Sequence, residues 1–138
     1  MTQGHTHILY AEDNLPDVLL LREALVELNL DHHVHHVENG EDALAFLARE
    51  GTYQGAPTPS LLLLDLNLPR KNGFEVLAEI RQRGQPLPCP IAVLTTTARE
   101  QDARIAAAGV DFDFFIKPMD YDSFLAVVQK LDSLVATA

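Results

Sequence analysis

The sequence predicts an α/β domain in which helices cover both faces of a five-stranded, doubly wound parallel β-sheet. Short apolar runs of strand length alternate along the chain with longer segments whose apolar residues recur every three or four positions. One apolar run, Leu61–Leu64, is apolar on both faces, which is typical of a central strand that is covered on both sides. This alternation uses the whole chain of 138 residues, so we expect a single domain.

Composition and charge exclude several classes of protein. The formal net charge of -10 repels phosphate backbones and anionic lipid, so we expect binding to neither nucleic acid nor membrane. No apolar run approaches the roughly 20 residues of a membrane-spanning helix, and Met1–His7 is too polar for a signal peptide. The single cysteine, Cys89, excludes an intramolecular disulfide. These features indicate a cytoplasmic protein.

The first part of the chain contains two predicted strands and two helices. His7–Ala11 is a short apolar run that stops at charged residues, as a buried strand does. The helix that follows has Pro16 in its first turn. Its buried stripe consists of Val18, Leu21, Leu25 and Leu28. His33–Glu38 is a weaker strand candidate, and Asn39 caps a second helix that ends at Gly51.

The second part of the chain continues the same alternation after a loop. Gly51–Ser60 contains one further glycine and two prolines and is expected to be that loop. The later elements are the strand Leu61–Leu64, a helix over Gly73–Arg83 closed by Gly84, the strand Pro90–Thr95, an Ala-rich helix over Ala98–Ala108 closed by Gly109, the strand Phe112–Ile116, and a helix capped by Asp120 that continues to about Val135.

Chemically matched side chains follow four of the predicted strands. Glu12 and Asp13 follow the first strand, Asp65 the third, Thr95 ends the fourth and Lys117 follows the fifth. Ligands of doubly wound sheets bind at the carboxyl ends of the strands, so these groups are expected to converge. Each residue alone is explained equally well as a cap or turn residue. The set of four strand ends favours a functional site.

The chemistry of this set suits phosphoryl transfer to a carboxylate. Three neighbouring acids repel one another unless a cation neutralises them, and Mg²⁺ prefers such oxygen ligands. A carboxylate that attacks phosphorus forms an aspartyl phosphate. The Lys117 ammonium and the Thr95 hydroxyl can compensate the charge of the phosphoryl group.

Four segments together resemble the receiver domain of two-component response regulators, over nearly the whole chain. They are ILYAEDN (Ile8–Asn14), LLLLDLNLPRKNGFEVL (Leu61–Leu77), PIAVLTTTA (Pro90–Ala98) and FFIKPMD (Phe114–Asp120). The resemblance implies a flavodoxin-like receiver fold with the strand order 2-1-3-4-5. It also implies that residues 1–138 form a single receiver domain with no output domain.

The resemblance assigns a role to each site residue. Asp65 is the phosphoacceptor, and Asp13 and Asp65 are carboxylate ligands of Mg²⁺. Glu12 acts on the metal through water, and Asn67 contributes its backbone carbonyl. Thr95 and Lys117 bind the phosphoryl group; Thr95 and Phe114 form the switch that changes the surface of the fourth helix, fifth strand and fifth helix. The peptide bond between Lys117 and Pro118 is expected to be cis.

The resemblance also implies partners. The long loop before the third strand and the LDLNLP segment are similar to those of small regulators that pair with bacterial phytochrome-type histidine kinases. The last helix has a wide apolar face, which indicates either deeper burial or a partner helix from a second copy. We expect a homodimer through the fourth helix, fifth strand and fifth helix. The residues of the wide face are Tyr121, Phe124, Leu125, Val127, Val128, Leu131, Leu134 and Val135.

Two other functions are weighed against the phosphorylated switch. A phosphohydrolase that forms an aspartyl phosphate usually has a second acid two residues after the nucleophile, but Asn67 stands there and cannot act as a general acid. A constitutive binding module with a receiver fold would not need the acidic pair, Asp65, Thr95 and Lys117, all of which are present.

A histidine cluster allows a further hypothesis. His32, His33, His35 and His36 lie in one predicted strand, with His5 and His7 upstream, and imidazole suits transition metals. Strand alternation places His33 and His35 on one face and His32 and His36 on the other, which gives no obvious tetrahedral set. We therefore expect solvated histidines on an edge strand rather than a metal site.

Overall fold

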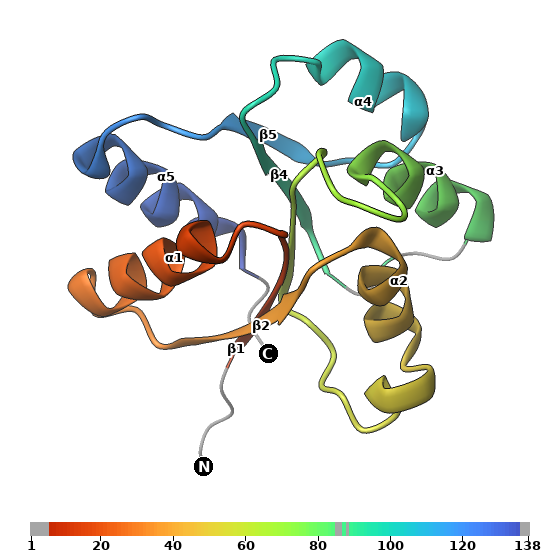
Figure 1. The fold of residues 1–138 in the computed structure, drawn as a ribbon, viewed down its shortest axis with the longest axis horizontal. Coiled ribbons are helices and arrows are strands. Elements are labelled where there is room, and N and C mark those ends of the chain that lie inside the picture. Colours follow the sequence, from red (N-terminus) through yellow and green to blue (C-terminus); the bar gives the residue numbers. More distant parts are fainter. Residues whose placement is uncertain (1–5, 85–86, 88, 136–138) are drawn as a thin grey trace.

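Five parallel strands form the centre of the computed structural model, which describes residues 6–84, 87 and 89–135. The strands are β1 (Thr6–Ala11), β2 (His32–Val37), β3 (Leu61–Leu64), β4 (Ile91–Thr95) and β5 (Asp113–Ile116). Their order in the sheet is β2-β1-β3-β4-β5, and every neighbouring pair is parallel (Figure 1). The predicted fold class and strand order are confirmed.

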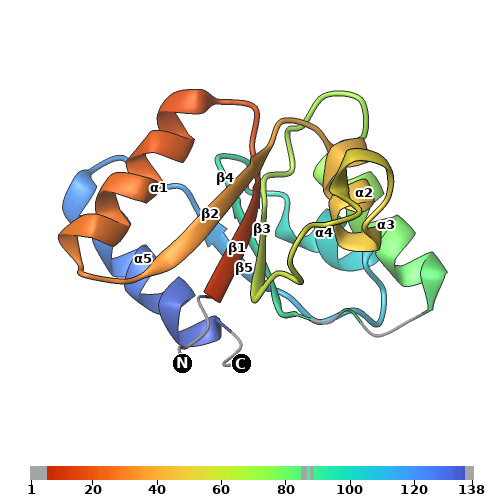
Figure 2. The same cartoon turned by 90° about the horizontal axis from the view of Figure 1, so that it is seen from below.

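Helices cover both faces of this sheet. They are α1 (Leu15–Glu27), α2 (Gly40–Ala48), α3 (Gly73–Arg83), α4 (Glu100–Ala106) and α5 (Tyr121–Leu134). Helices α1 and α5 lie on one face, and α2, α3 and α4 lie on the other (Figures 1 and 2). No helix in the described ranges is both long and apolar enough to cross a membrane.

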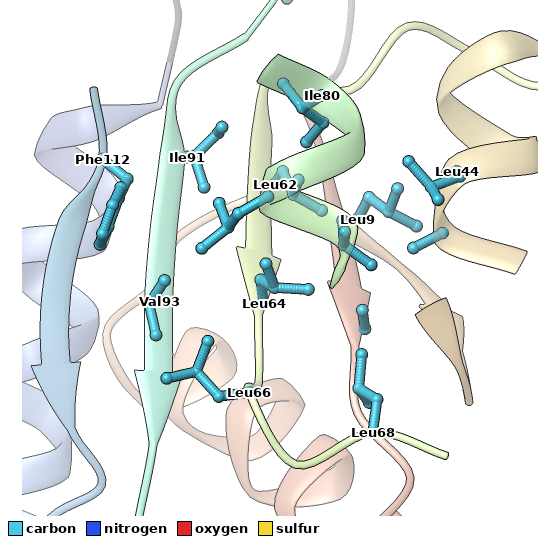
Figure 3. Close-up of a cluster of buried hydrophobic side chains, with 14 of the residues drawn as sticks. Leu9, Leu44, Leu62, Leu64, Leu66, Leu68, Ile80, Ile91, Val93 and Phe112 are labelled. Carbon is cyan, nitrogen blue, oxygen red and sulfur yellow. The ribbon is translucent and has the colours of Figure 1, made fainter. Parts of the chain in front are cut away.

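The two faces of the sheet form two separate cores. Successive residues of a strand point to opposite faces, so Leu61 and Leu63 pack under α1 and α5, whereas Leu62 and Leu64 pack under α2 and α3. All four leucines are fully buried. Figure 3 shows the second core, where Leu62, Leu64 and Val93 of the sheet face Ile80 of α3. The central position predicted for β3 is confirmed.

Apart from one-residue shifts at element ends, the structure differs from the predicted elements in three places. A short 3-10 helix, η1 (Gly51–Tyr53), lies in the segment predicted to be a loop. Helix α2 ends at Ala48, before Arg49 in the left-handed conformation, and not at Gly51 as predicted. Helix α4 is shorter than the predicted Ala98–Ala108, although alanine favours helix. Arg99 at its N-cap provides no side-chain hydrogen bond to stabilise an earlier start.

Candidate functional site

The carboxylates of Glu12, Asp13 and Asp65 form an acidic triad at the carboxyl end of the sheet. One ligand oxygen from each lies within 4.8 Å of the other two. Glu12 follows β1 and Asp65 follows β3, and these strands are neighbours in the sheet. Glu12 and Asp65 are buried, while Asp13 is exposed and leaves the triad open to solvent.

Backbone hydrogen bonds fix the two buried acids just beyond their strands. The Glu12 N–H donates to the Val37 carbonyl at 2.9 Å, and the Asp65 N–H donates to the Ala11 carbonyl at 3.1 Å. The Glu12 carbonyl also lies 2.6 Å from Nε2 of His36. The β-ladder therefore continues one residue past each strand and holds the acids side by side.

The turn into α3 supports Asp65 from the other side. The Asn67 N–H donates to Oδ1 of Asp65 at 3.2 Å, and the Gly73 N–H donates to the Leu66 carbonyl at 3.0 Å. Asn72 and Glu75 form a capping box at the start of the helix. A Cβ at Gly73 would lie 2.6 Å from the Asp65 carbonyl oxygen, so only glycine fits this approach.

The Lys117 ammonium lies among carboxylates from three elements. Its Nζ is 2.5 Å from Oε1 of Glu12, 2.8 Å from Oδ2 of Asp17 and 3.4 Å from Oδ2 of Asp65. The backbone N–H of Lys117 donates to the Thr95 carbonyl at 2.7 Å. The structure thus brings Glu12, Asp65 and Lys117 together as the sequence predicts, and adds Asp17, which sequence reasoning missed.

The local sequence around Asp17 explains its presence without any role in the site. It lies in the first turn of α1, the helix that begins directly after the acidic pair. Its placement there agrees with the helix dipole and therefore has a structural explanation. The sequence alone offered no reason to direct its side chain at Lys117, because that contact joins residues 100 positions apart.

Burial and hydrogen bonds together shift the pKa values of Lys117 and Glu12. Burial lowers the pKa of Lys117, but hydrogen bonds to Asp17 and Glu12 outweigh it and raise that pKa above the usual range. Burial raises the pKa of Glu12, against the opposing effect of its hydrogen bond to Lys117. One ammonium therefore leaves the acids short of positive charge. A hard divalent cation such as Mg²⁺ fits this donor set, because it prefers oxygen ligands and retains several waters on its open side.

The two residues predicted to form a switch lie on β4 and β5. Thr95 ends β4, is fully buried, and its hydroxyl accepts the Thr97 N–H. Phe114 of β5 pairs with Val93 in the sheet and is half-buried against the core under α2, α3 and α4. Thr95 therefore lies at the strand end predicted for it, whereas Phe114 lies within its strand.

The prediction of a cis peptide bond before Pro118 is wrong. The Lys117–Pro118 bond is trans, and no cis peptide bond occurs among the described residues. The trans isomer of an X–Pro bond is favoured by about 0.5–1 kcal/mol, so it is the form adopted unless the surroundings select the other.

The histidines do not form a second metal group. Among the described residues, the acidic triad is the only set of three potential ligands close enough to share an ion. His35 lies 2.9 Å from His7 through ring nitrogens, and His32 lies 2.7 Å from Asp132. The histidine side chains alternate between the two faces of β2 as predicted, but those of His32, His35 and His36 are half-buried rather than solvated. His5 lies outside the described residues.

The comparisons with known proteins agree with this geometry. Residues 8–129 match the response regulator receiver domain. The chain belongs to this family. Its members are typically phosphoacceptors rather than enzymes, and the resemblance predicted from the sequence is confirmed.

Relatives include response regulators of phytochrome systems. Response regulator Rcp1 of Synechocystis sp. is 39% identical over 127 residues, which are 91% of this chain and 86% of Rcp1. The Mn²⁺-bound structure of Rcp1 has a TM-score of 0.78 at 37% identity, covering 96% of this chain and 97% of that one. The phosphorylated cyanobacterial phytochrome response regulator RcpA has a TM-score of 0.79 at 36% identity, with coverages of 94% and 93%. The bacteriophytochrome response regulator AtBRR has a TM-score of 0.74 at 33% identity, with coverages of 99% and 98%.

Proposed function

We propose that this chain is a stand-alone response regulator in which Asp65 accepts a phosphoryl group from a histidine kinase in the presence of Mg²⁺. The observation that carries the proposal is the acidic triad of Glu12, Asp13 and Asp65 beside the Lys117 ammonium. In this proposal residues 1–138 act as one receiver domain. The relative Rcp1, matched over 86% of its length, supports this arrangement.

Each residue of the site has a separate role in phosphoryl transfer. A carboxylate oxygen of Asp65 attacks phosphorus, forming a P–O bond as the P–N bond to the kinase histidine breaks. Lys117, already 3.4 Å from Asp65, pairs with an oxygen of the transferred group. Asp13 and Asp65 would hold Mg²⁺ directly, Glu12 through water and Asn67 through its carbonyl. The bound ion would supply positive charge that stabilises the phosphoryl oxygens.

Phosphorylation then biases two arrangements of the switch. The Thr95 hydroxyl moves from its Thr97 contact to a phosphoryl oxygen, and Phe114 moves into the vacated space. The surface of α4, β5 and α5 changes as a result, and the new surface binds a partner or passes phosphate along a relay. The weak 3.4 Å contact that now holds the Thr95 hydroxyl supports a low barrier to this movement.

The partners follow from the relatives and from the surface. RcpA and AtBRR are named as response regulators of phytochromes, so we propose a bacterial phytochrome as the sensor histidine kinase. Ile105 of α4 and Ile116 of β5 are exposed, which supports a homodimer through the α4-β5-α5 region. The apolar face of α5 contributes less to this argument, because Phe124, Val128 and Leu131 are buried in the core of the monomer.

Labelling by acetyl phosphate tests the proposal. With Mg²⁺ present, we expect intact-mass spectrometry to detect one added phosphoryl group, and we expect Asp65→Asn to abolish it without loss of the fold. Asp113→Asn, an exposed acid at the start of β5, is the charge-matched control and should label normally. The same samples analysed by sedimentation report whether the phosphorylated form is a dimer.

Two results would contradict the proposal. Mg²⁺-dependent labelling that persists in Asp65→Asn would place the phosphoacceptor elsewhere. Multiple-turnover release of phosphate from p-nitrophenyl phosphate would favour the phosphohydrolase, which we consider weaker because Asn67 provides no acid group.

A further inference from the structure

The third carboxylate at Lys117, Asp17, belongs to no metal group. The acidic triad consists of Glu12, Asp13 and Asp65. Asp17 lies on α1, and its Oδ2 is 2.8 Å from the Lys117 Nζ, closer than the 3.4 Å to Asp65. The Asp17 N–H donates to the side chain and to the carbonyl of Asn14, which fixes the residue in the first turn.

Mg²⁺ bound at the triad would compete with Lys117 for the same carboxylates. The Lys117 ammonium now pairs with Glu12 and Asp65, two members of the triad. A cation bound by the triad would weaken both pairs. Only 13% of the Lys117 side chain is exposed, so an ammonium left without a carboxylate would be a poorly solvated, unpaired charge. Asp17 is the partner that remains.

The space around the pair permits this exchange. A small cavity of about 30 Å³ is lined by Asp17, Lys117 and Pro118 together with Tyr10 and Leu20. Its size allows a small displacement of the ammonium or one water molecule. The ammonium can therefore move away from Glu12 and stay beside Asp17 without leaving the vicinity of Asp65.

We propose that Asp17 is a positioning residue that holds the Lys117 ammonium beside Asp65 while Mg²⁺ occupies the acidic triad. The proposal rests on the proposed function and deepens it. Asp17 reduces competition between Lys117 and the metal, and it keeps Lys117 within reach of the incoming phosphoryl group. Its effect on the metal is therefore exerted through Lys117 rather than by direct coordination.

A double-mutant cycle on the full chain tests this mechanism. Mg²⁺ affinity is measured by calorimetry, without phosphodonor, for the wild type, Asp17→Asn, Lys117→Gln and the double variant. We expect Asp17→Asn to weaken Mg²⁺ binding about ten-fold in the presence of Lys117, because the freed ammonium then competes for the triad. In the Lys117→Gln background the same substitution should change the affinity less than about two-fold.

Controls separate this mechanism from a general effect of charge. Glu23→Gln removes one exposed acid elsewhere on α1 and should leave Mg²⁺ affinity nearly unchanged. Equal weakening by Asp17→Asn in both backgrounds would show through-space attraction alone and overturn the proposal. Unchanged or tighter Mg²⁺ binding by Asp17→Asn would overturn it too, as would a wild type that binds no Mg²⁺. Circular dichroism checks that each variant is folded.

The double-mutant cycle and the labelling experiment test the two proposals separately. If the wild type binds Mg²⁺ and shows the coupling but takes no phosphate, the proposed function fails and the role of Asp17 toward the metal stands. If the wild type is labelled at Asp65 but the cycle shows no coupling, only the role of Asp17 fails.

Discussion

Single residues in the site differ in exposure, and this difference gives the three acids different tasks. Glu12 is 1% exposed and accepts hydrogen bonds from the Tyr10 hydroxyl at 3.3 Å and the Asn14 N–H at 3.1 Å, so its orientation is fixed. Asp13 is exposed and can turn toward an arriving cation. Asp65 is buried, and its side chain is 6% exposed, but one of its oxygens belongs to the triad. The triad thus combines two buried acids with one exposed acid that can adapt its position.

The thiol of Cys89 is expected to be unreactive in the folded protein. Burial raises its pKa to about 11, because the interior disfavours the thiolate. We expect alkylation by iodoacetamide at pH 8 to be roughly 100-fold slower in the native protein than in the unfolded chain, since the thiolate is the reactive form. Mass spectrometry over time measures both rates in the same protein. Equal rates would show that the thiol is neither buried nor shifted in pKa.

The turn between β3 and α3 shows how one element positions another. Gly73 begins α3 and lies so close to the preceding strand end that a Cβ would be 2.6 Å from both the Asp65 carbonyl oxygen and the Leu66 Cα. The capping box of Asn72 and Glu75 holds the helix at this distance. The position of Asp65 therefore depends on the start of the next helix.

Substitution of Gly73 tests this dependence. We expect Gly73→Ala to lower the free energy of unfolding by about 1–3 kcal/mol, because the backbone at Asp65 must shift, and to slow labelling by acetyl phosphate. Gly55→Ala is the matched control, since its Cβ would meet open space. Urea denaturation and the labelling rate measure the two effects. A Gly73→Ala variant as stable and as rapidly labelled as Gly55→Ala would contradict the model of a close approach.

The bounds of helices and strands are predicted best from the sequence where the local pattern of residues agrees with the packing in the folded chain. The bounds of β3 and α3 are confirmed, since an apolar run and a capped amphipathic helix have few alternatives. Helix α4 is shorter than predicted: no side-chain hydrogen bond caps its N-terminus, and alanine content alone does not fix where a helix begins or ends. Glu12, Asp65 and Lys117 are predicted to share one site because each follows a predicted strand. The pairing of Asp17 with Lys117 is long-range, and neighbouring residues in the sequence do not indicate it.

At the scale of the whole molecule, the sheet separates two cores and places Glu12, Asp65, Thr95 and Lys117 at the carboxyl ends of its strands. Residues of β1 and β3 contribute to both cores, so the strands that carry Glu12 and Asp65 are held from both faces. The exposed mouth of the triad lies at the end of these rigid strands. Mg²⁺ binding should therefore require little rearrangement of the backbone and should stabilise the native state directly.

Metal binding is expected to stabilise the whole fold by mass action. An ion that binds only the native state at ten times its Kd raises the free energy of unfolding by about 1.4 kcal/mol. We expect this increment in urea denaturation of the wild type with Mg²⁺, and we expect Asp13→Asn to lose most of it, because the variant lacks a ligand of the triad. Leu131→Ala, which weakens the core under α1 and α5, should keep the increment because Leu131 lies on α5 and not on the strands that carry the triad. An equal increment in Asp13→Asn and the wild type would place the stabilising ion elsewhere on the molecule.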